Sequence, residues 1–438
     1  MTIRIERPVR GGTVRAIASK SEVHRLLICA ALAEQTPHNQ GAFISCPECS
    51  DDIHATSSCL KAMGAEIRYE NDGFFVKPIN RTLNSLQHKG LALDCGESGS
   101  TLRFLLPVCG ALGLSVSFRM KGRLPNRPLE PLYKEMTSHG CTLSEPGLNP
   151  LSCEGHLNSG TYTLPGNISS QYVSGLLFAL PLLSGDSIIR ITGVLESRPY
   201  VDMTLDTLKK FGITILENRD EFFIEGGQSA SFPEKIKTGG DWSNAAFWLS
   251  AGAIVKGNTA PGKAFTCTGL DPDSLQGDRA IVELLKRFGA AITESNDSVT
   301  VLAGALHGID IDAADTPDLV PILAALASVA EGKTTIRNAG RLRNKESDRL
   351  KSVALSLSVL GADIREREDS LEITGKKDLP GGITESFGDH RIAMAAAILS
   401  AACTGPVIIQ NAEAVRKSYP NFFEDLSTAF GGEYVIVE

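Results

Sequence analysis

The sequence has no excess of basic residues. Its 438 residues include 43 Lys and Arg against 51 Asp and Glu, which gives a formal net charge of −8. Nucleic acids and anionic membrane surfaces are polyanions and select basic proteins, so we expect no nucleic-acid partner and no membrane partner. A small anionic ligand is compatible with this balance, because its site needs only a local cluster of Lys and Arg.

Long apolar runs are also missing. The longest, near residues 176–183, 320–330 and 392–403, are rich in Ala and broken by Pro or Ser. They are shorter than the roughly 18 residues that a membrane-spanning helix needs. The opening MTIRIERPVRGG alternates apolar with charged residues and has no apolar core typical of a signal peptide. We therefore expect a cytoplasmic protein.

The ten cysteines show no disulfide-like spacing. Cys46 and Cys49 form one C-x-x-C, but a zinc site needs a second such pair. A redox pair is the alternative, yet the flanking residues are typical of a turn before a helix, so we expect reduced thiols. P-loop, dinucleotide-binding, H-E-x-x-H, EF-hand and G-x-S-x-G motifs are all absent. With eight dispersed His residues, the sequence predicts no metal site.

What the sequence does contain is an internal repeat. Each copy has an apolar helix end, a Gly, a half-exposed strand, a turn and a second strand, and the sixth copy is truncated by the end of the chain. The glycines recur every 70 to 77 residues, as Gly64, Gly140, Gly212, Gly289, Gly361 and Gly431. A Gly at this position is typical of the left-handed residue that ends a helix, and the alternation after it predicts a strand.

The repeat predicts an α/β (α+β) fold of six βαβαββ units with buried helices and outward sheets. Helices such as those over 170–183 and 389–402 are apolar on nearly every face, which indicates burial. Six units are too many for one core. We therefore expect two three-repeat domains, 19–240 and 1–18 plus 241–438, with a hinge at the two crossings. The opening strand over 2–9 would complete the truncated last repeat.

Two positions in each repeat, about 41–48 and 11–14 residues before the Gly, predict helix starts. N-capping explains the acidic residues Asp51, Asp241, Asp315 and Asp278 found there. It does not explain the seven cations, which are Lys20, Arg127, Arg198, Lys345, Arg349, Arg391 and Lys417. A cation opposes the macrodipole at a helix N-terminus, unless an anion lies between it and the backbone N–H groups. These positions predict a pocket for a multiply anionic substrate in a cleft between the domains.

Five motifs carry a resemblance to a known family. They are Lys20-Ser21 with Arg25, GESGSTLR over 96–103, SSQ over 169–171, KESDR over 345–349 and DHR over 389–391. From about residue 11 to the C-terminus, the chain resembles the 5-enolpyruvylshikimate-3-phosphate (EPSP) synthases, the 3-phosphoshikimate 1-carboxyvinyltransferases. The resemblance implies the enolpyruvyl transferase fold of two domains with three repeats each.

The same resemblance implies a reaction of the shikimate pathway to chorismate and aromatic amino acids. The enolpyruvyl group of phosphoenolpyruvate passes to the 5-hydroxyl of shikimate 3-phosphate through a tetrahedral intermediate, and phosphate is released. It implies no cofactor and no partner other than these two substrates. Members of the family are often inhibited by glyphosate in the phosphoenolpyruvate subsite, and the sequence leaves the response of this chain open. Because the cationic motifs are divided between the two halves, we expect the domains to close on shikimate 3-phosphate. We expect the enzyme to be a monomer.

Residue roles follow from the resemblance motif by motif. Asp318 is implied to accept the 5-hydroxyl proton, Glu346 to protonate the phosphoenolpyruvate methylene, and Lys20 to touch both substrates. Shikimate 3-phosphate would be bound by Lys20, Ser21, Arg25, Ser169, Ser170, Gln171, Ser197, Tyr200, Asp318, Arg341 and Lys345. Phosphoenolpyruvate would be bound by Lys20, Gly99, Arg127, Gln171, Glu346, Arg349, His390, Arg391 and Lys417. Many relatives have Asn in place of Arg341, which leaves its contact with the shikimate ring open.

Two alternatives compete with this interpretation. UDP-N-acetylglucosamine enolpyruvyl transferase has the same fold, but that family uses a Cys on a mobile loop and lacks the KESDR run. Cys95 and Cys109 lie in the corresponding region, within apolar sequence. A non-catalytic repeat scaffold would explain six copies. It would not explain Asp318, Glu346 and seven cations at matched positions.

Overall fold

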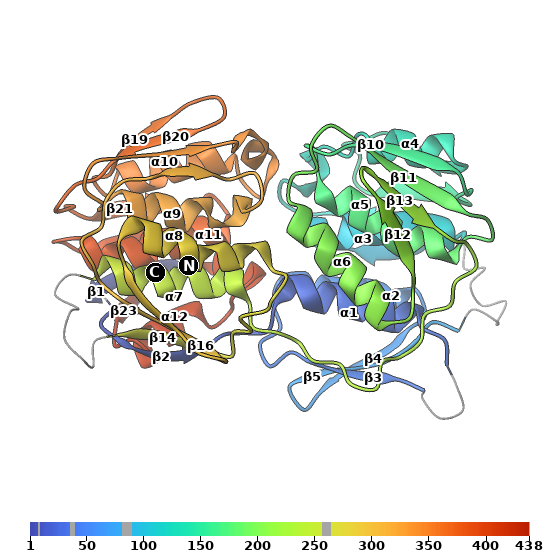
Figure 1. The fold of residues 1–438 in the computed structure, drawn as a ribbon, viewed down its shortest axis with the longest axis horizontal. Coiled ribbons are helices and arrows are strands. Elements are labelled where there is room, and N and C mark those ends of the chain that lie inside the picture. The colour runs from blue at the N-terminus through green and yellow to red at the C-terminus, as the bar shows by residue number, and fades with distance from the viewer. Residues whose placement is uncertain (8, 36–39, 81–89, 256–263, 438) are drawn as a thin grey trace. The chain divides into compact units, whose positions relative to one another are not determined.

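The computed structural model describes residues 1–7, 9–35, 40–80, 90–255 and 264–437. The chain forms two compact units (Figure 1). Unit 1 contains Met1–Ile17 and Gly239–Glu438, and unit 2 contains Ala18–Thr238. The chain therefore begins in unit 1, builds all of unit 2, and then returns to unit 1.

Unit 2 holds the first three repeats. The first contains α1 (Lys20–Leu32), β3 (Ala42–Ser45), α2 (Asp51–Ala62), β4 (Glu66–Glu70) and β5 (Gly73–Lys77). The second contains β6 (Leu91–Asp94), α3 (Gly99–Ala111), β7 (Val116–Arg119), the 3₁₀ turn η2 (Leu124–Asn126), α4 (Leu132–Ser138), β8 (Cys141–Leu143) and β9 (Leu151–Gly155). The third contains β10 (Thr161–Pro165), α5 (Ser170–Ala179), η3 (Leu180–Leu182), β11 (Ser187–Thr192), α6 (Arg198–Lys210), β12 (Ile215–Asn218) and β13 (Glu221–Ile224).

Unit 1 holds the other three repeats. The fourth contains β2 (Gly12–Arg15), α7 (Trp242–Ile254), β14 (Phe265–Thr268), η4 (Gly277–Ala280), α8 (Ile281–Phe288), β15 (Ala291–Glu294) and β16 (Ser298–Leu302). The fifth contains β17 (Asp310–Asp312), η5 (Pro317–Leu319), α9 (Val320–Ala327), β18 (Lys333–Arg337), η6 (Gly340–Asn344), α10 (Arg349–Ser358), β19 (Asp363–Glu366) and β20 (Leu371–Thr374). The sixth contains β1 (Thr2–Arg7), β21 (Gly382–Glu385), α11 (His390–Leu399), η7 (Ser400–Ala402), β22 (Val407–Gln410), η8 (Ala412–Lys417), α12 (Phe422–Thr428) and β23 (Glu433–Val437).

The repeats share one sheet topology, as the sequence predicts. In the third repeat the strand order is β10-β11-β13-β12, with β10 parallel to β11 and the β12–β13 hairpin antiparallel. The second and fifth repeats have the same order, β6-β7-β9-β8 and β17-β18-β20-β19. The predicted fold of βαβαββ units is confirmed.

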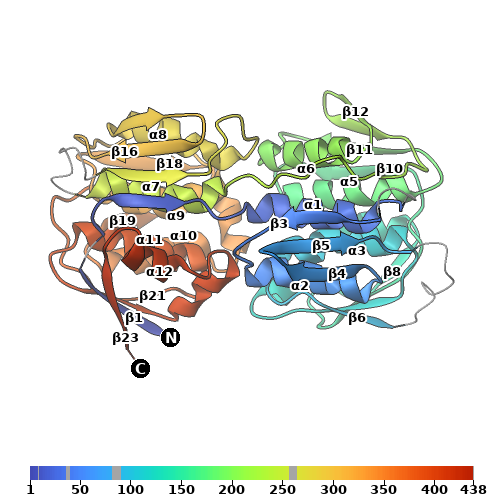
Figure 2. The ribbon, with the colours of Figure 1, turned by 90° about the horizontal axis from the view of Figure 1, so that it is seen from below.

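The N-terminal segment supplies strands to two other repeats. β1 lies between β22 and β23 and pairs antiparallel with both, which confirms that the opening strand completes the last repeat. Figure 2 shows β1 beside β23, close to both chain termini. β2 pairs parallel with β14 and provides the first strand of the fourth repeat. The sequence did not predict this second exchange, and the described part of the first repeat accordingly forms a three-stranded sheet.

All six repeat glycines adopt the left-handed conformation, with φ between +64° and +106°. Each therefore ends a helix where an L side chain would be strained. A second left-handed position follows the second strand of four repeats directly, at Gly193, Gly269, Asn338 and Asn411. This second position was not predicted, because Asn also tolerates the conformation and the four residues differ in identity.

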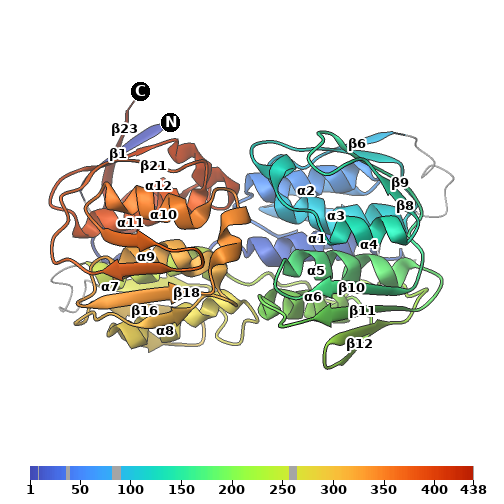
Figure 3. The same cartoon turned by 90° about the horizontal axis from the view of Figure 1, so that it is seen from above.

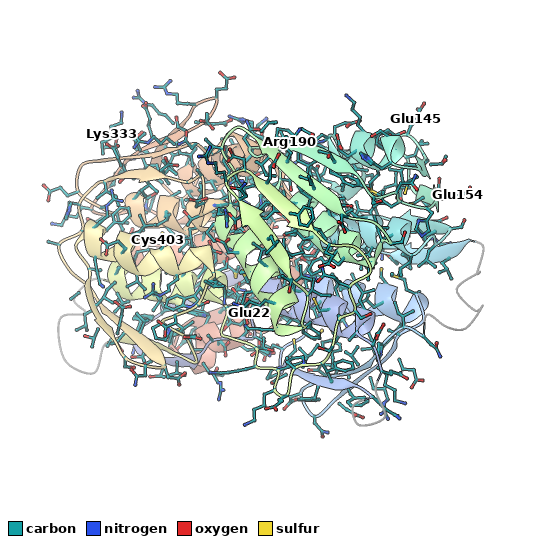
Figure 4. All side chains as sticks on the ribbon, turned by 45° about the vertical axis from the view of Figure 1, so that its right-hand side comes forward. Glu22, Glu145, Glu154, Arg190, Lys333 and Cys403 are labelled. Atoms are coloured by element: carbon teal, nitrogen blue, oxygen red, sulfur yellow. The ribbon has the colours of Figure 1, made fainter. Side chains whose placement is uncertain are left out.

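The core of each unit is made of buried helices. In unit 2, α3 packs against α5, and in unit 1, α7, α9 and α11 pack against one another. Every residue of α7, α9 and α11 is buried. Figure 3 shows α3 and α5 inside strands β8, β9, β10 and β11. Figure 4 shows Glu154, Arg190 and Lys333 on the outer faces of their sheets, where they are exposed. Burial of the helices and exposure of the sheets are as predicted.

Two kinds of feature are absent from the described residues. None of their helices combines the length and the apolarity needed to cross a bilayer. Within the same ranges, no group of three or more His, Cys, Asp and Glu side chains is placed to hold a metal ion.

Candidate active site

Arg25 of α1 is a buried cation in unit 2. Its side chain donates from Nε to Thr204 Oγ1 at 2.9 Å, from Nη1 to the Ser21 carbonyl at 2.6 Å and from Nη2 to the Tyr200 carbonyl at 2.7 Å. The guanidinium also lies 5.2 Å from the centre of the Phe104 ring. Arg25 is 2% exposed, its donors go to a hydroxyl and two carbonyls rather than to a carboxylate, and burial lowers its pKa to about 10. A buried cation with no carboxylate in direct contact is costly, and a bound anion relieves that cost.

Lys20, the first residue of α1, is already paired with a carboxylate. Its Nζ lies 2.9 Å from Asp52 Oδ2 in the first turn of α2, and both side chains are largely buried. Thr101 in the first turn of α3 reaches the Asp52 carbonyl from its Oγ1 at 3.5 Å. The first turns of α1, α2 and α3 therefore meet around Lys20. Asp52 is a neighbour of the site that was not predicted from the sequence.

A chain of buried hydrogen bonds fixes these helix starts. His24 Nδ1 lies 2.7 Å from Thr56 Oγ1, Thr56 Oγ1 lies 2.6 Å from Thr101 Oγ1, and Thr101 Oγ1 donates to Ser98 Oγ at 2.7 Å. Ser98 is also the N-cap of α3. Burial lowers the pKa of His24 well below its usual range, and Lys20 and Arg25 lower it further, so His24 is neutral at pH 7. The chain ties α1 and α2 to the N-terminus of α3.

Gly99 lies against two guanidinium groups. A Cβ at Gly99 would be 2.8 Å from Arg127 Nη1 and 3.2 Å from Arg103 Nη1, so no side chain fits here without moving them. Arg103 Nη1 donates to Gln171 Oε1 at 2.8 Å, and Gln171 Nε2 donates to Ser100 Oγ at 2.9 Å. The structure thus gathers the predicted Gly99, Arg127 and Gln171 into one cluster. Arg103, a cation within an otherwise apolar helix, belongs to it too.

The predicted serines and tyrosine of unit 2 lie at the starts of α5 and α6. Ser169 is the N-cap of α5 and accepts from the Gln171 N–H at 3.3 Å, and Ser170 is the first helical residue. Ser197 precedes α6 with a left-handed φ of +54°. Tyr200 in the first turn of α6 contributes its carbonyl to Arg25. Ser169 and Ser170 thus adjoin the Gly99 cluster through Gln171, and Tyr200 adjoins Arg25.

In unit 1, Arg349 is the centre of a cluster with three carboxylates. Its Nε donates to Asp389 Oδ2 at 2.9 Å, its Nη1 to Asp318 Oδ1 at 2.8 Å and its Nη2 to Glu346 Oε2 at 2.7 Å. Arg349 is the first residue of α10 and is 1% exposed. Its pKa is raised because these carboxylates outweigh the effect of burial. The two predicted catalytic carboxylates, Asp318 and Glu346, are therefore held at the two ends of one guanidinium group.

Asp318 also contacts two further predicted cations. Arg391 Nη2 donates to Asp318 Oδ2 at 3.1 Å, and Lys345 Nζ lies 3.7 Å from Oδ1. Burial alone would raise the pKa of Asp318, but Arg391, Lys345 and Arg349 together hold it well below its usual range. Asp318 is therefore ionised at neutral pH, the state that a proton acceptor needs.

Asp389 is the third carboxylate of this cluster and also caps a helix. It is fully buried, caps α11 by accepting from the Arg391 N–H at 3.0 Å, and accepts from Ser347 Oγ at 3.2 Å. The predicted His390 is buried, with its Nδ1 3.8 Å from Asp389 Oδ1. Asp389 is part of the DHR motif, but no role was predicted for it. The signal was present, because an Asp before an apolar helix is a candidate N-cap.

Arg341 and Lys417 lie in short 3₁₀ turns. Arg341 of η6 donates from Nη2 to the Ala314 carbonyl. Lys417, the last residue of η8, donates to the Gly388 carbonyl at 2.6 Å. Phe387, next to Gly388, has a φ of +54°, which is strained for an aromatic residue. This strain lies in the segment that meets Lys417.

Three of the predicted helix starts are wrong in detail. Arg127 follows η2 and precedes α4 by several residues, Lys345 follows η6, and Lys417 ends η8. In these repeats a 3₁₀ turn precedes the second helix, and its residues resemble those of a helix start. The sequence pattern therefore did not distinguish the turn from the helix. These three cations therefore do not oppose a macrodipole, whereas Arg198 and Arg349 do begin α-helices.

These features define a class of protein. Repeated βαβαββ units with cations gathered near the ends of buried helices form the enolpyruvyl transferase fold. The chain superposes on the EPSP synthase structure from Acinetobacter baumannii with a TM-score of 0.79, at 25% identity, over 99% of this chain and 100% of that one. It shares the fold of the enolpyruvyl transferase NikO from Streptomyces tendae, with a TM-score of 0.75 at 20% identity, over 99% and 98% of the two chains.

The sequence comparisons identify the family within this class. Residues 4–426 match the family described as EPSP synthase (3-phosphoshikimate 1-carboxyvinyltransferase), and the chain belongs to that family. The 3-phosphoshikimate 1-carboxyvinyltransferase of Clostridium kluyveri is 46% identical over 424 residues, covering 96% of this chain and 95% of that protein. That of Clostridium acetobutylicum is 46% identical over 425 residues, with the same coverage. The chain is thus a transferase of the shikimate pathway of aromatic amino acid biosynthesis.

Proposed function

We propose that the chain transfers the enolpyruvyl group of phosphoenolpyruvate to the 5-hydroxyl of shikimate 3-phosphate and releases phosphate. The observation that carries this proposal is the family match over residues 4–426. The structure supports it with two sets of cations, one in each unit. Both substrates carry a phosphate and a carboxylate, so together they need several charge-assisted contacts.

Unit 2 is proposed to bind shikimate 3-phosphate through Arg25, with Ser21, Ser169, Ser170, Ser197 and Tyr200 around it. The support is the buried guanidinium of Arg25, whose donors go to a hydroxyl and two carbonyls rather than to a carboxylate. The Gly99 cluster is proposed to bind phosphoenolpyruvate, because the Arg127 and Arg103 guanidinium groups both lie against the bare backbone of Gly99 at the start of α3. Lys20 and Gln171 would serve both substrates.

Unit 1 is proposed to supply the proton chemistry. Ionised Asp318 accepts the proton of the 5-hydroxyl while the hydroxyl oxygen attacks C2 of phosphoenolpyruvate. Glu346 in its protonated form gives a proton to the methylene carbon, which becomes the methyl group of a tetrahedral intermediate. The Glu346 carboxylate then takes a proton back from this methyl group as the C–O bond to phosphate breaks, which restores the double bond and releases phosphate. The support is that Arg349 contacts both carboxylates from different nitrogens, which keeps base and acid close but separate. Arg391, Lys345, Lys417 and His390 would complete the anion contacts, and Arg341 would face the shikimate ring.

The reaction is tested by phosphate release. Incubation with phosphoenolpyruvate and shikimate 3-phosphate should release one phosphate for each enolpyruvyl product formed, without added metal or organic cofactor. UDP-N-acetylglucosamine as the acceptor should give no release, which separates the proposal from the related transferase of the same fold. Release with the nucleotide sugar alone would overturn the assignment of substrate.

We further propose that the active site lies in a cleft between the two units, which closes on shikimate 3-phosphate. The motivation is that the proposed anion contacts are divided between the two units, so an anion that contacts both sets favours the closed form. Small-angle scattering should show a smaller radius of gyration with shikimate 3-phosphate than without it. A radius that stays the same with each substrate and with both together would contradict closure.

We also propose that the enzyme acts in the cytoplasm as a monomer. All ten cysteines are free thiols, as is usual in reducing compartments. Every proposed substrate contact comes from a single chain, so no second copy is needed to complete the site. Sedimentation at several protein concentrations would measure the oligomeric state.

A further inference from the structure

The hydrogen-bonding capacity of Arg349 is nearly used up within the protein. A guanidinium group has five N–H donors. Arg349 directs Nε to Asp389, Nη1 to Asp318, and Nη2 to both Glu346 and Asp389, the last at 3.4 Å. It is also 1% exposed. An anionic substrate can therefore reach a full set of contacts with Arg349 only by replacing a carboxylate that is already there.

Asp318 also contacts the other cations of this cluster. Its Oδ2 accepts from Arg391 Nη2 at 3.1 Å, and its Oδ1 lies 3.7 Å from Lys345 Nζ and 2.8 Å from Arg349 Nη1. One carboxylate thus contacts three cations that the family resemblance assigns to substrates. Arg25 of unit 2 is different, because its donors go to carbonyl and hydroxyl oxygens. A substrate phosphate at Arg25 need not displace any carboxylate of the described chain.

We propose that Asp318 and Glu346 are internal competitors of the substrate anion in unit 1. Both carboxylates contact Arg349 and Asp318 also contacts Arg391, and phosphoenolpyruvate binds by displacing them from these contacts. Asp389 stays in place, because it is fully buried and also caps α11. This inference rests on the proposed function and adds to it the way in which the phosphoenolpyruvate contacts form.

The exchange couples binding to chemistry. While Asp318 is surrounded by Arg391, Lys345 and Arg349, its pKa is far below that of an effective base. When the substrate anion takes over these cations, the Asp318 pKa rises towards its usual range and its oxygen is released toward the attacking hydroxyl. A general base works best when its pKa approaches the working pH. The base therefore becomes effective only after the anion has bound.

The test is calorimetric binding of phosphoenolpyruvate without an acceptor, so that no turnover occurs. Asp318→Asn and Glu346→Gln each remove one competing charge with little change of shape. Each variant should bind phosphoenolpyruvate about tenfold more tightly than the wild type, since a charge-assisted competitor is lost. Asp310→Asn is the matched control, because Asp310 is an exposed residue of β17 in the same unit. Its affinity should equal that of the wild type.

Tighter binding combined with a lower kcat in the same variants is the expected result, and a purely structural role of the carboxylates would not produce it. Equal or weaker binding by both folded variants would overturn internal competition. Circular dichroism checks folding, and if Asp318→Asn does not fold, Glu346→Gln decides the question. A wild type that releases no phosphate from phosphoenolpyruvate and shikimate 3-phosphate refutes the proposed function instead, so the two failures are distinguishable.

Discussion

Replacing Asp318 with Asn is expected to lower kcat by about 10²–10⁴-fold, the usual contribution of general acid–base catalysis. The amide is nearly isosteric with the carboxylate but cannot accept the 5-hydroxyl proton. Glu346→Gln should cause a similar loss, because the amide cannot protonate the methylene carbon. Binding of shikimate 3-phosphate should persist in both variants, since its proposed phosphate contact, Arg25, lies in unit 2. Steady-state phosphate release gives kcat, and calorimetry gives the affinity.

Asp310→Asn again serves as the control, with an expected kcat equal to that of the wild type. A decrease of less than about tenfold in Asp318→Asn with intact binding would mean that Asp318 is not the base. The same result for Glu346→Gln would assign the proton donor to another group. Because the two carboxylates share Arg349, the double variant should lose little more than the more impaired single variant.

Much of the fold was predictable because the repeat constrains it locally. Six glycines at nearly constant spacing mark helix ends, and all six have the left-handed φ that this position requires. The Asn71-Asp72-Gly73 turn was recognisable as well, and Asn71 and Asp72 both have positive φ, as hairpin turns of this kind demand. The truncated last repeat lacked one strand, which indicated that the opening strand would complete it.

Strand exchange and turn type were harder to predict because they depend on tertiary packing. β2 has four residues and pairs in parallel with β14, more than 250 residues further along the chain, and nothing in its sequence names that partner. The 3₁₀ turns η2, η6 and η8 precede helices with the same polar composition as helix starts. Pattern alone therefore located Arg127, Lys345 and Lys417 near helices but misplaced the helix boundaries.

The candidate site was predictable in its residues but not in its pairing. Core packing does not require cations at the two repeat positions. Their presence there therefore indicated an anionic ligand. Which carboxylate each cation contacts depends on how the helices pack, so the sequence did not reveal that Arg349 is buried among Asp318, Glu346 and Asp389. These contacts give Arg349 two roles, because a buried arginine that pairs with several carboxylates stabilises the fold in addition to binding the substrate.

The two arginines proposed to bind phosphoenolpyruvate should therefore respond differently to the same substitution. Arg127→Lys should raise KM for phosphoenolpyruvate by about 10- to 150-fold, because Lys lacks the planar fork and loses charge-assisted bonds. Its thermal unfolding midpoint should change little, because Arg127 lies outside any α-helix. Substrate kinetics and thermal unfolding of the purified variant measure the two effects.

Arg349→Lys should raise the same KM and also destabilise the protein. A single ammonium group cannot bridge three carboxylates at 2.7–2.9 Å, and fully buried Asp389 would lose its main counter-charge. Breaking a buried ion pair in this way costs about 3–5 kcal/mol, which lowers the unfolding midpoint by several degrees. Arg25→Lys is the contrasting control, because it should weaken shikimate 3-phosphate and leave phosphoenolpyruvate largely unaffected. If all three variants impaired the two substrates equally, the division into subsites would be wrong. If Arg349→Lys unfolded at the wild-type temperature, the structural role of its cluster would be wrong.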